Sequence, residues 1–93
     1  MNTVTAATGM KITFKLYASL TAYLPASAQR DNQIPLELPE GSTVGQVIAP
    51  LGMPPKLVHL VLVNGVYVAP AERLSKVLVD GDVLAIWPPI AGG

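Results

Sequence analysis

The chain ends in Val83-Leu84-Ala85-Ile86-Trp87-Pro88-Pro89-Ile90-Ala91-Gly92-Gly93. The first five of these residues are apolar, which predicts a strand over residues 83–87. Each of the two prolines that follow fixes φ at about −65° and lacks a backbone N–H, so sheet pairing is expected to end there. The four residues after the prolines, residues 90–93, span about 13 Å when fully extended. This stretch therefore predicts a strand that leads directly into a flexible tail over residues 88–93.

The tail carries one reactive group, the α-carboxylate of Gly93. Gly92 and Gly93 have no Cβ, so the tip can enter a channel that a side chain would block. This arrangement indicates a carboxylate that is delivered into the active site of another protein. A passive chain end is the alternative, because terminal residues are commonly mobile.

Length and composition favour one folded domain. A chain of 93 residues can build one core and is too small for a second. Hydrophobic residues make up 51% and charged residues 13%, with a formal net charge of zero. This composition excludes a disordered chain and offers no electrostatic footprint for nucleic acid or an anionic membrane. With so few charges, some apolar surface is expected to stay exposed, which favours a protein partner.

Residues that form stand-alone active sites are scarce in this sequence. The chain has no cysteine, which excludes disulfides, a thiolate nucleophile and a cysteine-ligated metal. His59 is the single histidine and lacks the companions that a zinc site or a catalytic triad needs, so a structural role is expected. We therefore expect no metal site, no bound cofactor and no catalytic side chains in this chain by itself.

Residues 1–9 are small or polar and include no basic residue, so they do not resemble a signal peptide. We expect them to form a disordered leader, ahead of a folded domain over residues 10–87. No apolar run reaches the length of a transmembrane helix. The expected location is the cytoplasm.

The first half of the domain shows two strand patterns. Over residues 10–17 the apolar side chains occupy the even positions, which predicts a half-buried strand. Residues 18–24 have apolar side chains at helical spacing and predict a short helix of about two turns before Pro25. Residues 26–33 are polar and loop-like. Residues 34–38 predict a second strand, and Pro35 favours a place at the edge of the sheet.

A capped helix follows the second strand. Thr43 and Gln46 match a capping box, and apolar residues at helical spacing continue to residue 51. Pro50 removes a hydrogen bond from the last turn and Gly52 favours a stop, so the helix is expected to fray after Ala49.

The pattern in the second half of the domain predicts strands joined by tight turns. Residues 60–63 are apolar on both faces, as expected of a strand with neighbours on each side. Asn64-Gly65 predicts a type I′ hairpin that returns over residues 66–68. A helical turn around Leu74 is expected within residues 71–77, and Asp80-Gly81-Asp82 predicts a turn before the last strand.

This order predicts an α+β fold in which one main helix packs across a small sheet. The β-grasp arrangement fits it. Strand parity further places Tyr17, Tyr67 and Trp87 on the face away from the helix, near the start of the tail. Because Tyr and Trp are enriched at interface centres, we expect these residues to form a partner-binding surface. Ordinary packing at the edge of the sheet is the alternative.

The tail closely resembles the end of the small subunit of molybdopterin synthase. Other matching segments are residues 11–20, 40–44, 63–65 and 80–82. Over residues 10–93 the chain is similar to the family of sulfur carriers that serve molybdopterin and thiamine biosynthesis. These proteins are ubiquitin-like β-grasp domains with a small mixed sheet, one main helix and an extended C-terminal tail.

This resemblance implies a mechanism and a set of partners. An E1-like enzyme uses ATP to adenylate Gly93, and a sulfur donor converts the adenylate to a thiocarboxylate. The tail residues Pro88, Pro89, Ile90, Ala91 and Gly92 then carry Gly93 into the large subunit of molybdopterin synthase, which supplies the catalytic groups. Carriers for thiamine synthesis, tRNA thiolation or cysteine synthesis and ubiquitin-like modifiers share this ending. A non-covalent ubiquitin-like binding module, in which the tail is passive, is the alternative from another class.

Overall fold

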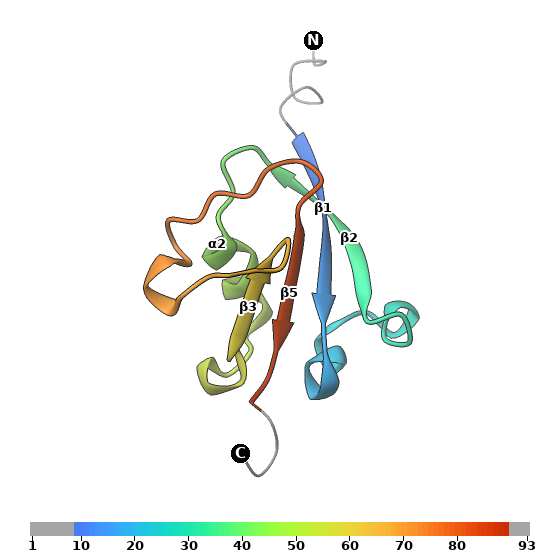
Figure 1. Ribbon diagram of the computed structural model, residues 1–93. Helices are drawn as coiled ribbons and strands as arrows, with labels where there is room; N and C mark the ends of the chain where they lie inside the picture. Colours follow the sequence, from blue (N-terminus) through green and yellow to red (C-terminus); the bar gives the residue numbers. More distant parts are fainter. Residues whose placement is uncertain (1–8, 90–93) are drawn as a thin grey trace.

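The computed structural model describes residues 9–89 as one sheet with a helix on one face (Figure 1). The sheet has five strands in the order β2-β1-β5-β3-β4. The strands are β1 (Gly9–Leu16), β2 (Gln33–Pro39), β3 (Leu60–Val63), β4 (Val66–Tyr67) and β5 (Val83–Trp87). The α-helix is α2 (Val44–Ile48), and short 3₁₀ helices are η1 (Ala18–Tyr23), η2 (Ala26–Ala28), η3 (Ala49–Leu51), η4 (Pro55–Leu57) and η5 (Pro70–Glu72).

The last strand lies in the middle of the sheet. β5 pairs in parallel with β1 and antiparallel with β3, while β1–β2 and β3–β4 are antiparallel pairs. A mixed sheet with one helix across it is the α+β β-grasp fold predicted from the sequence. In Figure 1, β5 runs between β1 and β3 toward the C-terminal end of the chain.

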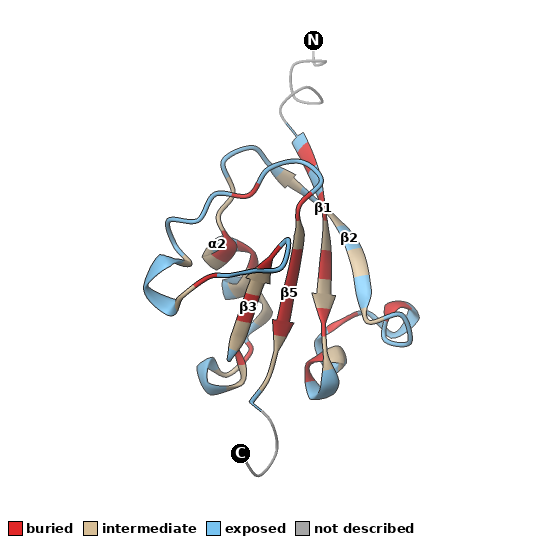
Figure 2. Ribbon diagram, in the orientation of Figure 1, coloured by how far each residue is buried: buried red, intermediate tan, exposed pale blue. Residues whose placement is uncertain are grey.

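The core lies between the sheet and α2 (Figure 2). The even residues of β1 are buried, as their alternation predicts. They meet apolar residues of the central strands and of the helix. The largest fully buried side chains are Ile12, Phe14, Leu16, Leu20, Val44, Val61, Leu78, Leu84 and Ile86.

Strand limits differ slightly from the expected ones. β1 begins at Gly9, which pairs with Pro39, so the first strand takes in the last residue of the expected leader. Residues 1–8 and the tail residues 90–93 lie outside the described residues. β1 ends at Leu16, and Tyr17 continues beside β5 through one hydrogen bond from its N–H to the carbonyl oxygen of Ile86 (3.1 Å).

β2 occupies an edge of the sheet, as Pro35 predicts. The N–H of Leu16 donates to the carbonyl oxygen of Asn32 (3.0 Å), so the even residues of this strand are the ones that bond to β1. Because bonding alternates along an antiparallel pair, the odd residues present their backbone outward. Pro35 and Pro39 stand at such outward positions and lack a donor, which protects this edge from pairing with another strand.

The predicted capping box is confirmed. The N–H of Gln46 donates to Thr43 Oγ1 (3.2 Å), and the N–H of Thr43 donates to Gln46 Oε1 (3.0 Å). The α-helix ends at Ile48 and tightens into η3, which contains Pro50. Gly52 then adopts a left-handed conformation with φ of 69°. The helix is therefore even shorter than the sequence suggests.

Two other predictions need correction. The expected helix over residues 18–24 is a 3₁₀ helix, η1, and the expected loop over residues 26–33 contains η2. The helical turn expected around Leu74 is present: it follows η5 directly, and the N–H of Lys76 donates to the carbonyl oxygen of Glu72 (2.9 Å). Leu74 itself is 77% exposed. Within residues 9–89 no helix is long and apolar enough to cross a membrane.

A polar lock joins the β3–β4 hairpin to the turn before β5. Asp82 is 7% exposed, and its carboxylate accepts from Asn64 Nδ2 (2.8 Å) and from the N–H of Val79 (2.9 Å). Asn64 Oδ1 accepts from the N–H of Val83 (2.9 Å). Asn64 and Gly65 have φ of 51° and 84°, as the predicted type I′ turn requires. The hairpin and the start of β5 are thus fixed to each other.

Asp82→Ala is expected to lower the free energy of unfolding by about 2 kcal/mol, because two donors lose a charged acceptor in a mostly buried site. Urea unfolding followed by circular dichroism measures this loss. Asp80→Ala is the matched control, since Asp80 Oδ1 accepts its bond from the N–H of Lys11 (2.8 Å) at an exposed site. Equal losses in the two variants would contradict the lock.

Candidate functional site

The start of the tail is held from both sides. Ile86 accepts a hydrogen bond from Tyr17 on the β1 side (3.1 Å), and the carbonyl oxygen of Trp87 accepts from the N–H of His59 on the β3 side (3.2 Å). Pro88 is half-buried and Pro89 is exposed. The chain therefore leaves the sheet from its central strand, at a position that both neighbouring segments fix.

An aromatic pair stands beside this point. The rings of Tyr17 and Trp87 are stacked, with centroids 3.9 Å apart and an interplanar angle of 5°. Leu84 and Ile86 are fully buried against the core, so the alternation of β5 turns Trp87 toward the outer face of the sheet, away from α2. Both rings are half-buried, which leaves part of their surface open to a partner.

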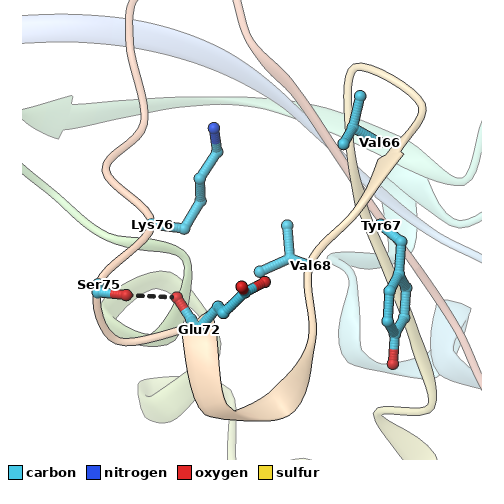
Figure 3. A pocket seen from close by; sticks show the side chains of 6 residues that line it. All are labelled: Val66, Tyr67, Val68, Glu72, Ser75 and Lys76. Carbon is cyan, nitrogen blue, oxygen red and sulfur yellow. Dashed lines mark hydrogen bonds between the residues drawn. The ribbon is translucent and has the colours of Figure 1, made fainter.

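Tyr67 lies on the same outer face, farther along the sheet. It is 51% exposed and pairs with Leu62, which in turn pairs with Ala85 of β5. Alternation with Tyr67 predicts that Val66 and Val68 face the core; Val68 is buried, but Val66 is 68% exposed. Figure 3 shows the reason: Val66 lies at the hairpin, at the open edge of the sheet.

Apolar side chains connect Tyr67 with the aromatic pair. Leu60 and Leu62 alternate with the buried residues of β3, so they face outward, and Leu60 pairs with Trp87. We call this surface the outer patch; it consists of Tyr17, Leu60, Leu62, Tyr67, Ala85 and Trp87. The sequence prediction omitted the two leucines. The apolar character of both faces of residues 60–63 is the sequence feature that could have identified these two leucines.

A pocket of about 350 Å³ lies between residues 66–68 and residues 72–76, and Tyr67 of the outer patch is one of the residues that line it (Figure 3). The ring of Tyr67 points away from Glu72 and Lys76 in this view. The hydroxyl of Ser75 donates to the carbonyl oxygen of Glu72 (3.1 Å), so these polar groups serve the local turn. Across the described range 9–89, no cluster of three or more His, Cys, Asp or Glu could hold a metal ion.

A family model described as Mut7-C ubiquitin matches residues 9–91. The chain belongs to this family. The match includes the whole sheet, the outer patch and the first tail residues. The sequence-based resemblance to ubiquitin-like carriers is thus confirmed at the level of the family and its fold. A sequence search of curated proteins gives no significant match.

Solved structures agree with the β-grasp assignment of this Mut7-C ubiquitin protein. The solution structure of the Haloferax volcanii HVO 2177 protein has a TM-score of 0.70 at 23% identity, covering 92% of this chain and 89% of that one. The crystal structure of SAMP1 from Haloferax volcanii has a TM-score of 0.64 at 23% identity, covering 89% and 99%. A Pyrococcus furiosus protein assigned as molybdopterin converting factor, subunit 1, has a TM-score of 0.55 at 24% identity, covering 87% and 99%. At these identities the likeness concerns the fold.

Tyr17→Ala is expected to shift the fluorescence emission of Trp87 to longer wavelength, because one face of the indole becomes exposed to water. Trp87 is the single tryptophan of the chain, so the signal has one source. The same variant should lower the free energy of unfolding by about 1 kcal/mol through loss of the stacked pair. Tyr67→Ala is the control, and an equal shift in that variant would contradict the stacking.

Proposed function

We propose that this Mut7-C ubiquitin protein is a sulfur carrier whose Gly93 carboxylate is activated, converted to a thiocarboxylate and presented to an acceptor enzyme. The observation that carries the proposal is the position of the tail. It starts at the end of the central strand, fixed by Tyr17 and His59, directly beside the outer patch. A partner that covers the patch therefore also meets Pro88, where the tail begins.

The outer patch has the composition of a docking surface. It combines two tyrosines and a tryptophan with two half-buried leucines, and aromatic residues of this kind dominate the energy of many interfaces. The stack holds the Tyr17 and Trp87 rings in place before binding, so fewer rotamers are frozen in the complex. The patch supplies affinity, and the tail supplies the reacting group.

Activation follows from the chemistry of a carboxylate, which is a poor electrophile. On an E1-like enzyme, a Gly93 carboxylate oxygen attacks the α-phosphorus of ATP and displaces pyrophosphate, giving an acyl-adenylate. A hydrosulfide equivalent from a sulfur donor then attacks the acyl carbon. The bond to AMP breaks, a proton is lost and a thiocarboxylate remains. The sequence has no cysteine, so sulfur carried by this chain resides on the terminus.

The most specific form of the proposal is the small subunit of molybdopterin synthase. The paired prolines ahead of Ile90-Ala91-Gly92-Gly93 support it, together with the fold shared with a protein assigned as a molybdopterin converting factor subunit. The large subunit would receive the tail and transfer the sulfur to a pterin precursor. The chain would then act as a sulfur-donating subunit and not as an enzyme by itself.

A ubiquitin-like modifier is the second candidate. The fold is shared with a protein described as small archaeal modifier protein 1 from Methanosarcina acetivorans, which has a TM-score of 0.59 at 23% identity. A modifier uses the same activation of Gly93. A lysine amine of a target protein, instead of the sulfur donor, then attacks the acyl carbon; AMP leaves, a proton is lost and an isopeptide bond forms.

Intact-protein mass spectrometry distinguishes these outcomes. The chain is incubated with ATP, the host E1-like enzyme and a sulfur donor, and a mass increase equal to one sulfur replacing one oxygen is expected on Gly93. Deletion of Gly93 should abolish the change. A covalent adduct to lysine would favour the modifier. If the mass does not change although the same enzyme activates a known carrier, the non-covalent binding module becomes the favoured function.

Trp87→Ala and Tyr67→Ala are each expected to weaken binding to the E1-like enzyme about tenfold or more, since interface aromatics contribute about 2 kcal/mol or more each. Surface plasmon resonance with the immobilised enzyme measures the affinity. Val79→Ala is the matched control, because Val79 is exposed but lies in the turn before β5, outside the patch. Unchanged affinity of both folded patch variants would contradict this docking surface.

A further inference from the structure

A separate pocket of about 280 Å³ opens on the helix side of the molecule. Its walls come from α2, η3, the connector before β3 and the segment after η5. The lining residues are Gly45, Ile48, Ala49, Met53, Pro55, Val58 and Arg73. Six of these seven residues carry no charge and no polar side chain, so the pocket is apolar with one cation at its rim.

Gly45 allows the segment after η5 to lie close to α2. Its N–H donates to the carbonyl oxygen of Arg73 (2.8 Å), and a Cβ at this position would stand 2.5 Å from Leu74 Cδ2. Leu74 therefore rests against the helix at the glycine while 77% of its surface stays exposed. The result is an exposed apolar side chain at the rim of an apolar pocket.

Arg73 brings a positive charge that its protein partners do not neutralise. Its guanidinium donates to the carbonyl oxygens of Val58 (3.2 Å) and Val68 (3.4 Å), with a longer contact to that of His59 (3.5 Å). These acceptors orient the guanidinium plane but carry no net charge. Lys56 follows Pro55 in η4 and is exposed, which adds a second cation near this rim.

The pocket lies near the start of the tail, but on the opposite face of the sheet from the outer patch. His59, which accepts from Arg73, also donates its N–H to the carbonyl oxygen of Trp87 (3.2 Å). The outer patch lies on the opposite face of the sheet from α2. An occupant of this pocket can therefore bind at the same time as a partner on the outer patch.

We propose that this pocket docks a short peptide segment of a partner protein, in which a bulky apolar residue is flanked by acidic residues. The volume is below the range of about 300–1,000 Å³ that small-molecule sites occupy, and it suits an anchoring side chain. A neighbouring carboxylate pairs with Arg73, since a guanidinium matches a carboxylate in geometry and charge. This inference stands independently of the carboxylate chemistry of Gly93.

A panel of fluorescein-labelled, N-acetylated and amidated hexapeptides tests it. Each peptide has a central Leu, Phe or Met, flanked either by glutamates or by lysines, and a glutamate-flanked peptide with a central alanine completes the set. Titration of the full-length chain is followed by anisotropy, and ¹⁵N-labelled protein locates the site by NMR. We expect the glutamate-flanked apolar peptides to bind and to shift the amides of Gly45, Ala49, Val58 and Arg73. The lysine-flanked and alanine-centred peptides should bind about tenfold more weakly or worse.

Substitutions at Ala49 provide a matched pair, because this residue lines the pocket and is exposed. Ala49→Glu should weaken binding of the glutamate-flanked peptides about tenfold, whereas Ala49→Lys should preserve or strengthen it. Ala26→Glu, on the exposed η2, is the control for added charge elsewhere. The proposal is overturned by three results: no binding at about 1 mM peptide, equal binding of lysine-flanked peptides, or amide shifts on the outer patch.

Discussion

The parallel pairing of β5 with β1 is the constraint on which the rest of the structure depends. Without it the chain has two separate antiparallel units, β1–β2 and β5–β3–β4, and no continuous sheet for α2 to cover. The pairing places Leu84 and Ile86 at the centre of the core, where both are fully buried. Such a contact joins the two ends of the sequence, so its loop-closure entropy must be offset by burial along the whole strand. The lock between Asp82 and Asn64 sets where this strand begins.

The same constraint fixes the C-terminal end of β5. A strand at the sheet edge would leave the following residues held from one side, whereas β5 is bonded on both. Trp87 is consequently fixed by His59 through its backbone and by Tyr17 through its ring. On the outer face, Ala85 of β5 lies between Leu62 of β3 and Lys15 of β1. The fold and the fixed position of Trp87 thus have one physical origin.

The two edge strands of the sheet are each protected against pairing with another strand. Prolines at outward backbone positions protect β2, and β4 has only two paired residues, so neither edge offers a long template for another strand. Among the large exposed apolar side chains, Tyr67 belongs to the outer patch and Leu74 stands beside α2, whereas Val66 lies at the hairpin. Both edges of the sheet are therefore poor templates for the addition of another strand.

Local signals in the sequence determined most of the elements. The alternation of β1, the capping box of Thr43 and Gln46, the Asn64-Gly65 turn and the edge position of Pro35 each depend on a few neighbouring residues, and each is confirmed. Segments without a strong local signal, residues 18–28 and 70–76, became 3₁₀ helices and turns whose limits depend on packing. The sequence also identified Tyr17, Tyr67 and Trp87 by parity, but not the stacking of Tyr17 on Trp87 or the leucines between them. Those contacts, and the pocket between Gly45 and Arg73, join residues far apart along the chain. Only the tertiary structure decided them, because their residues meet only where segments distant in the sequence pack together.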